Sequence, residues 1–124
     1  MIDRKHKLSE NFTLGEFLHK GVEVDSLPVY IIQNLTKLAR ELQKVRTKIG
    51  KPFVITSGYR TPAHNKAVGG AKNSWHMKGL AADFQVKGMT ADEAREAIGD
   101  WNGGVELGIP WVHLDLGPKR RFYP

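Results

Sequence analysis

The sequence predicts a domain in which helices and short strands are mixed. Three observations indicate this class: a long amphipathic helical pattern after Pro28, three short segments rich in β-forming residues, and two capping-box patterns that begin short helices. The chain has 124 residues, of which 40% are hydrophobic and 26% charged, as in ordinary globular proteins. We therefore expect residues 1–124 to form one domain, with residues 1–7 as a flexible leader.

Helical spacing is most extensive between Pro28 and Gly50. Apolar residues recur there every three or four positions, with lysines and arginines between them, which predicts an amphipathic helix of about six turns that ends at Gly50. The apolar stripe that we expect in the core consists of Ile31, Ile32, Leu35, Leu38, Leu42, Val45 and Ile49. Capping boxes at 13–16 and 90–93 predict two shorter helices, the second of which ends near Ile98.

Three segments have the composition of strands. Residues 53–56 predict a buried strand, residues 81–86 a second strand, and residues 111–116 a third with regular alternation of side chains. Segment 57–73 contains three glycines and a proline and predicts a long loop, and loops of that length are usually functional or disordered. Residues 99–110 predict a glycine-rich turn region.

Two histidines and an aspartate form the pattern with the most specific chemistry. His76, Asp83 and His113 offer two imidazoles and a carboxylate, and such a set with water in the fourth position is a recognised catalytic zinc arrangement. Gly79 would let the chain turn back between His76 and Asp83. His113 and Asp115 project from one face of the third predicted strand. On spacing alone a structural role stays open as the alternative, because isolated histidines are more often structural than metal-binding.

The composition limits the classes of partner. The net charge of +6 favours anionic partners such as nucleic acid, acidic lipid or an anionic cell-wall polymer. The densest basic cluster is 119–121, for which a solvated face is the ordinary interpretation. Because no aromatic–basic platform or nucleic-acid motif is present, we do not expect a nucleic-acid partner. The chain has no cysteine, which excludes disulfides and thiolate metal sites.

Targeting features are also missing from the sequence. The first residues, MIDRKHKLSENF, lack the apolar core of a secretory signal, and no stretch approaches the roughly 18 apolar residues of a membrane span. We therefore expect a protein made in the cytoplasm without a signal peptide, and no membrane insertion.

Several linked motifs resemble one known family. The stretches SGYRTPAHNKAVGGAKNSWHMKGLAADF and WVHLDLGPKRRFYP resemble the zinc D-Ala-D-Ala carboxypeptidase family, and more narrowly its small single-domain bacterial and phage members. The family signature is Ser-x-His-x-x-Gly-x-Ala-x-Asp, followed by a second His on a strand. The matching residues are Ser74, His76, Gly79, Ala81, Asp83 and His113.

The resemblance runs from Leu8 to the C-terminus and implies both a fold and an activity. The implied fold is α+β, with zinc held on a small, mainly antiparallel sheet flanked by helices. The implied activity is zinc-dependent hydrolysis of peptidoglycan stem or cross-link peptides, by a carboxypeptidase or an endopeptidase of the phage-lysin type. We expect a monomer that acts at the cell wall after release or delivery, with a phage or prophage origin.

The resemblance also implies roles for individual residues. His76, Asp83 and His113 would be the zinc ligands. Arg60 matches a family arginine that holds a substrate carboxylate or carbonyl, which suits a guanidinium, although ordering of its loop is the alternative. Ser74 would contact the substrate or orient a ligand.

The chain departs from its family at the general base. Many relatives carry a Glu three residues before the second zinc His, or another His two before it, and Pro110 and Trp111 stand at these positions here. We expect Asp115 to be the general base or to support a zinc ligand, with Glu106 as the rival base. The alternative function is a catalytically inactive, zinc-containing cell-wall binding module.

Overall fold

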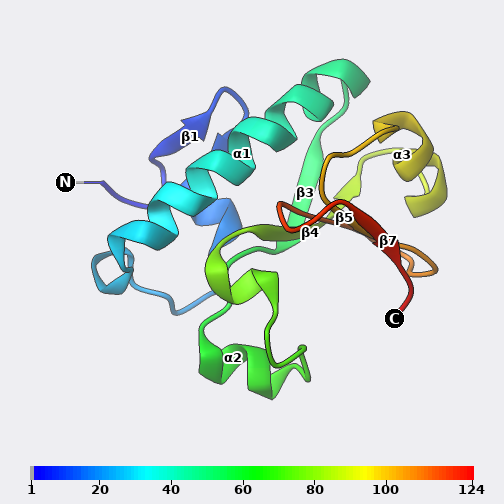
Figure 1. Cartoon of the computed structure of the whole chain (residues 1–124). Helices are drawn as coiled ribbons and strands as arrows, with labels where there is room; N and C mark the ends of the chain where they lie inside the picture. Colours follow the sequence, from blue (N-terminus) through cyan, green and yellow to red (C-terminus); the bar gives the residue numbers. More distant parts are fainter. Residues whose placement is uncertain (1) are drawn as a thin grey trace.

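The computed structural model describes residues 2–124 (Figure 1). Its helices are α1 (Val29–Ile49), α2 (Pro62–Ala67) and α3 (Ala91–Ile98), with 3-10 helices η1 (Leu14–Phe17), η2 (Val24–Ser26) and η3 (Trp75–Lys78). Its strands are β1 (Lys7–Ser9), β2 (Phe12–Thr13), β3 (Phe53–Ser57), β4 (Ala81–Val86), β5 (Gly104–Glu106), β6 (Val112–Asp115) and β7 (Arg120–Phe122). Within residues 2–124, no helix has the length and apolar character needed to cross a membrane.

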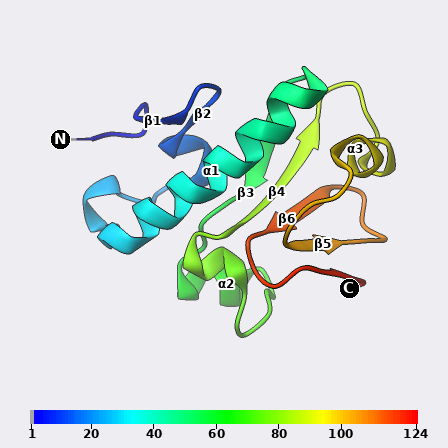
Figure 2. The same cartoon turned by 45° about the horizontal axis from the view of Figure 1, so that its top comes forward.

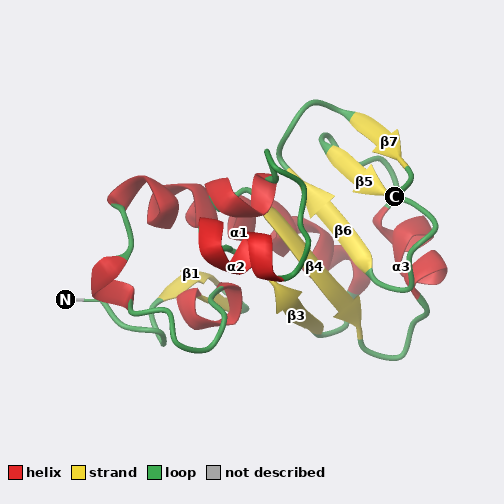
Figure 3. Ribbon diagram, turned by 90° about the horizontal axis from the view of Figure 1, so that it is seen from below, coloured by secondary structure: helices red, strands yellow, loops and turns green. Residues whose placement is uncertain are grey.

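The main sheet has five strands in the order β3-β4-β6-β5-β7 (Figure 3). Its neighbouring strands are antiparallel, except that β5 and β7 run parallel. β1 and β2 form a separate antiparallel pair. This arrangement confirms the predicted α+β class, with helices around a small, mainly antiparallel sheet.

The core lies between α1 and the apolar face of the main sheet. α1 lies over β3 and β4 in Figure 2, and it ends at Gly50 in the left-handed conformation, as the sequence predicts. The predicted stripe is buried or half-buried along its whole length. The residues of β4 and β6 that join this core are Ala82, Phe84, Val86, Val112 and Leu114. The opposite face of the same strands is therefore free to carry polar side chains.

Three local predictions need correction. Segment 57–73 is not a continuous loop, because it contains α2, a helix too short to show a helical period. β3 is not a fully buried strand: it lies at the edge of the sheet, and Val54 is 55% exposed. The turn region 99–110 contains β5, whose three residues fall below the length at which alternation can be read.

The N-terminal segment makes defined contacts, beginning with Ile2, which packs against the core. The Arg4 guanidinium donates to the backbone carbonyls of Leu18, His19 and Val22 at 3.0–3.2 Å. Lys7 pairs with Thr13 in the small sheet. These contacts involve part of the leader expected at residues 1–7, of which Met1 lies outside the described residues.

Candidate metal centre

The central strands bring three polar side chains to one face of the sheet. In the antiparallel register, Asp83 of β4 lies opposite His113 of β6, and His113 lies opposite Glu106 of β5. Directly opposed residues project from the same face, so these three side chains stand in a row across three strands. Since side chains alternate along a strand, this row lies on the face away from the apolar core.

His76 reaches the row from outside the sheet. It lies in η3, whose N-cap Ser74 accepts a hydrogen bond from the His76 backbone N–H at 3.1 Å. η3 ends at Gly79, where φ is +71°, a left-handed conformation that glycine adopts readily. The chain then enters β4, so that His76 and Asp83 come to face each other.

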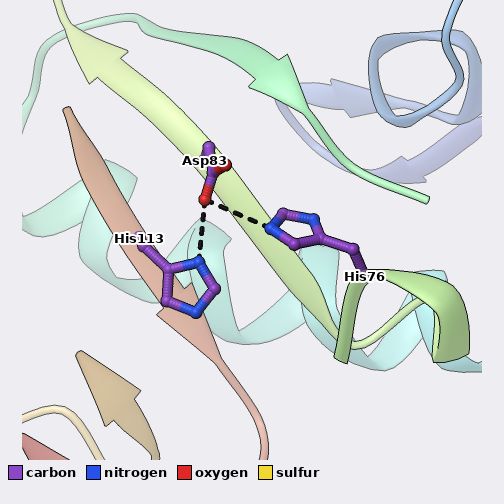
Figure 4. Close-up of side chains that lie close together, drawn as sticks. All are labelled: His76, Asp83 and His113. Carbon is purple, nitrogen blue, oxygen red and sulfur yellow. Dashed lines mark hydrogen bonds and ion pairs between the residues drawn. The ribbon is translucent and has the colours of Figure 1, made fainter. Parts of the chain in front are cut away.

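Three ligand-type atoms converge where η3 meets β4 and β6 (Figure 4). Asp83 Oδ1 lies 2.8 Å from His113 Nδ1 and 3.3 Å from His76 Nε2. The three atoms lie within 4.8 Å of one another, and all three side chains are buried. The residues chosen from sequence as a metal set are therefore brought together.

The outer hydrogen bonds fix which nitrogen of each imidazole faces Asp83. His76 Nδ1 donates to the Gly58 carbonyl at 2.8 Å, because a carbonyl oxygen can only accept. His113 Nε2 donates to Asp115 Oδ2 at 2.8 Å. His113 Nδ1 lies at the same 2.8 Å from Asp83 Oδ1. When both imidazoles are neutral and keep these outer protons, their remaining lone pairs point at Asp83 Oδ1, so three acceptors meet with no donor among them. Such a meeting point requires a proton or a cation, and two nitrogens with one oxygen form a set that zinc accepts.

The pKa shifts of Asp83 and His113 agree with a cation-binding site at this cluster. Burial lowers the pKa of His113, but its hydrogen bonds to Asp115 and Asp83 outweigh burial and raise that pKa to about 9. Burial raises the pKa of Asp83, but hydrogen bonds to His113 and His76 outweigh it and hold that pKa well below its usual range. The pocket is therefore anionic enough to hold a proton on a buried imidazole, and a divalent cation would satisfy the same carboxylates.

Arg60 lies beside this cluster and is bound to it. Its guanidinium donates to Asp83 Oδ2 at 3.4 Å, to Ser57 Oγ at 3.1 Å and to Asn65 Oδ1 at 3.3 Å. Its side chain is 16% exposed. Arg60 thus contacts the Asp83 oxygen that faces away from the imidazoles, while one edge of it reaches the cavity described below.

Asp115 lies behind His113 and is completely buried. Besides the His113 imidazole, it accepts hydrogen bonds from the backbone N–H groups of Gly104 and Gly117 and from the Arg120 guanidinium. Burial raises the pKa of Asp115, but the hydrogen bonds from His113 and Arg120 outweigh it and hold that pKa well below its usual range. Its oxygens are fully engaged by these donors.

A cavity of about 530 Å³ opens onto the cluster. The residues singled out from sequence all line it: Arg60, Ser74, His76, Asp83, Glu106, His113 and Asp115. Three aromatic side chains, those of Trp75, Trp111 and Phe122, add apolar wall. Within residues 2–124, none of the ion pairs involves Glu106, so its half-buried carboxylate faces the cavity without a cationic partner.

Sequence reasoning missed two groups that hold the site together. One is the Gly58 carbonyl, which no side-chain pattern can reveal. The other is Arg120, which belongs to the basic cluster interpreted as a solvated face but forms an ion pair with buried Asp115. The available signal for Arg120 was its place five residues after an acid in a strand, which by itself is common.

Comparison with known proteins gives one family and a small set of relatives. A family model described as Peptidase M15 matches residues 10–115. The peptidoglycan L,D-endopeptidase MepK of Escherichia coli K12 is 35% identical over 80 residues, which cover 58% of this chain and 44% of that protein. The probable peptidoglycan L,D-endopeptidase MepK of Haemophilus influenzae is 30% identical over 95 residues, which cover 67% of this chain and 50% of that protein. The chain thus spans about half the length of these relatives.

Proposed function

This chain belongs to the Peptidase M15 family, and we propose that it hydrolyses peptide bonds of peptidoglycan with a zinc ion held by His76, Asp83 and His113. The observation that carries the proposal is the convergence of two imidazole nitrogens and a carboxylate oxygen in the wall of a cavity. The zinc dependence of the family supports the metal, and the identity of both relatives as peptidoglycan L,D-endopeptidases, probable for the second, supports peptidoglycan as the substrate.

The ligand atoms follow from the hydrogen bonds around them. Zinc would be held by His76 Nε2, His113 Nδ1 and Asp83 Oδ1, because the other imidazole nitrogens are donors to Gly58 and Asp115. Zinc in such a site supplies an acidified water near neutral pH and polarises a scissile carbonyl. The remaining chemistry belongs to side chains of this chain.

We assign the general base to Glu106 and a supporting role to Asp115. Glu106 stands next to His113 on the same face of the sheet, lines the cavity and has no cationic partner within residues 2–124. It can therefore take a proton from water and deliver it to the leaving amine. Asp115 has its oxygens occupied by four residues and holds the Nε2 proton of His113 instead.

Arg60 and Ser74 then serve mainly to position other groups. The bonds of Arg60 to Asp83, Ser57 and Asn65 leave it little freedom to grip a substrate carboxylate. A carboxypeptidase must bind the free carboxylate next to the bond that it cuts, so this commitment favours an endopeptidase. Ser74 caps η3, and its hydroxyl hydrogen stays available to a substrate carbonyl.

The charge of the chain suits its proposed place of action. A net charge of +6 supports attraction to an anionic cell-wall polymer, which would concentrate the protein on its substrate. We propose that the chain acts at the cell wall as a monomer.

The test is hydrolysis of purified peptidoglycan by the zinc-loaded protein. We expect new amino groups, cleaved cross-link peptides in mass spectra, and a roughly 100- to 10,000-fold lower rate for Glu106→Gln at unchanged zinc content. Glu96→Gln, on the exposed side of α3, is the matched control and keeps the rate. Zinc binding without any cleavage would contradict the proposal and indicate a binding module.

A further inference from the structure

Arg120, the first residue of β7, forms a two-bond ion pair with Asp115 behind the proposed metal site. Arg120 Nη1 lies 2.9 Å from Asp115 Oδ1, and Arg120 Nη2 lies 3.0 Å from Asp115 Oδ2. Two parallel bonds between a guanidinium and a carboxylate fix the plane of the carboxylate as well as its position. Arg120 lies outside residues 10–115, which the family model matches.

The sheet is built so that this pair can form across an intervening strand. Gly104 of β5 lies between Asp115 of β6 and Arg120 of β7 in the register. A Cβ atom at position 104 would overlap Arg120 Nη1 and both carboxylate oxygens of Asp115. A glycine at this point therefore opens the path along which the guanidinium reaches the acid.

Arg120 itself is held from two further directions. Its Nη1 also donates to the Pro118 carbonyl at 3.0 Å, and its guanidinium lies 4.8 Å from the centre of the Phe122 ring. The Phe122 ring in turn meets the His113 imidazole edge-on, with ring centres 5.7 Å apart. β7 thus approaches His113 twice, through Asp115 and through Phe122.

From these contacts we propose that Arg120 is a positioning residue of the metal site, acting on His113 through Asp115. The proposal rests on the proposed zinc site. Arg120 fixes Asp115, Asp115 holds the His113 Nε2 proton, and His113 Nδ1 is thereby directed at the metal position. A histidine that binds zinc is neutral, so Arg120 is then the cation that balances the buried Asp115 charge.

The first test is the zinc affinity of Arg120→Gln, measured by competition between the zinc-free protein and a chromophoric chelator. We expect zinc to bind roughly 10- to 100-fold more weakly, the usual cost of losing an outer partner of a ligand. The matched control is Arg121→Gln. Arg121 is the next residue of β7 and donates to the Gly103 and Trp101 carbonyls instead, so its loss should leave zinc affinity within about 2-fold.

A second readout separates positioning from general stability. In the zinc-loaded protein, the His113 Nε2 proton should give a slowly exchanging NMR signal, and that signal should exchange faster in Arg120→Gln but not in Arg121→Gln. Arg120→Lys keeps the charge without the fork and should recover only part of the affinity. Gly104→Ala leaves both partners in the sequence but blocks their path, and it should reproduce the loss.

One result would overturn the proposal: Arg120→Gln or Arg120→Lys that binds zinc as tightly as the parent protein with an unchanged His113 signal. If Arg120→Gln does not fold, Arg120→Lys alone decides the question by the same two measurements. Neither measurement uses peptidoglycan, so a failure of the hydrolysis test leaves this proposal standing, and its own failure leaves hydrolysis untouched.

Discussion

Two regions deliver the proposed metal ligands, and they are built differently. On the sheet side, Asp83 and His113 face each other from neighbouring strands, and their positions are set by the register of β4 and β6. On the loop side, His76 stands on a four-residue 3-10 helix that is held by a side-chain cap, a left-handed glycine and one backbone carbonyl. The sheet side can move only if strands shift, whereas the loop side depends on a few individual contacts made by η3.

The outer partners of the two histidines differ as well. His113 donates to the buried carboxylate of Asp115, which forms an ion pair with Arg120, whereas His76 donates to the neutral Gly58 carbonyl. The sheet side therefore combines charge with rigidity, and its behaviour should depend on pH. The loop side carries no charge behind its ligand and should respond to backbone changes.

The largest effect is expected where both sides meet, at Asp83. Asp83→Asn removes the charge that faces both imidazoles, while the amide oxygen can still accept from Arg60. Zinc affinity should fall roughly 1,000-fold, which corresponds to about 4 kcal/mol, because one of the few ligands contributes about that much of the zinc-binding free energy. The rate of hydrolysis should fall with it. Isothermal titration with zinc measures the loss, and an Asp92→Asn variant on the exposed side of α3 serves as control. Retained tight binding in Asp83→Asn would show that the two sides do not share this ligand.

The next effect isolates the sheet side through pH. In the zinc-free protein the pKa of His113 is raised from 6.5 to about 9, so its stabilisation is complete below pH 6.5 and is lost as the pH rises towards 9. The pKa values of Asp83 and Asp115 are lowered, so their stabilisation is present above about pH 4 and is lost in acid.

Zinc-free protein should therefore lose up to about 3 kcal/mol of unfolding free energy between pH 6.5 and 9.5, at about 1.4 kcal/mol per pKa unit. Denaturant unfolding at several pH values measures this slope. His113→Gln provides the baseline for all other groups, and the slope of the parent protein should exceed it. Equal slopes would mean that His113 is not held as the doubly protonated imidazolium in the folded, zinc-free state.

The sequence was informative about the sheet side for a physical reason. Strand alternation acts over two residues, so the pattern in 111–116 sufficed to place His113 and Asp115 on one face and Leu114 on the other. It could not reveal that the Arg120 guanidinium would form an ion pair with the Asp115 carboxylate, because that contact depends on the parallel pairing of β7 with β5. Local composition does not determine the register between strands that are distant in the sequence.

The loop side was harder to predict because its contacts span many residues. The carbonyl that orients His76 belongs to Gly58, 18 residues earlier in the sequence. α2 has six residues, fewer than two full turns, so no helical period could mark it. Only the turn at Gly79 could be predicted from the sequence, because a left-handed position strongly favours glycine.

Substitutions confined to the loop side should have smaller effects on stability and zinc affinity, and the first of them is Gly79→Ala. The left-handed backbone costs about 1–2 kcal/mol for a residue with a Cβ, and that atom would also crowd the Ile31 carbonyl at 3.2 Å. Gly88→Ala is the matched control, since φ there is +82° and no atom lies within 4 Å of the added Cβ. Thermal unfolding should show a loss in both variants, with a larger loss and weaker zinc binding in Gly79→Ala alone.

The smallest effect is expected from the cap of η3. Ser74→Ala removes the oxygen that accepts from the His76 backbone N–H, which should cost about 1 kcal/mol. Thr90→Ala removes a cap with the same 3.1 Å bond from α3, away from the cavity, and should cost a similar amount. The two variants should unfold alike, but only Ser74→Ala should bind zinc more weakly and shift the His76 NMR signals. Equal zinc affinity in both would show that His76 is held by Gly58 and Gly79 without its cap, and the loop side would then be as rigid as the sheet.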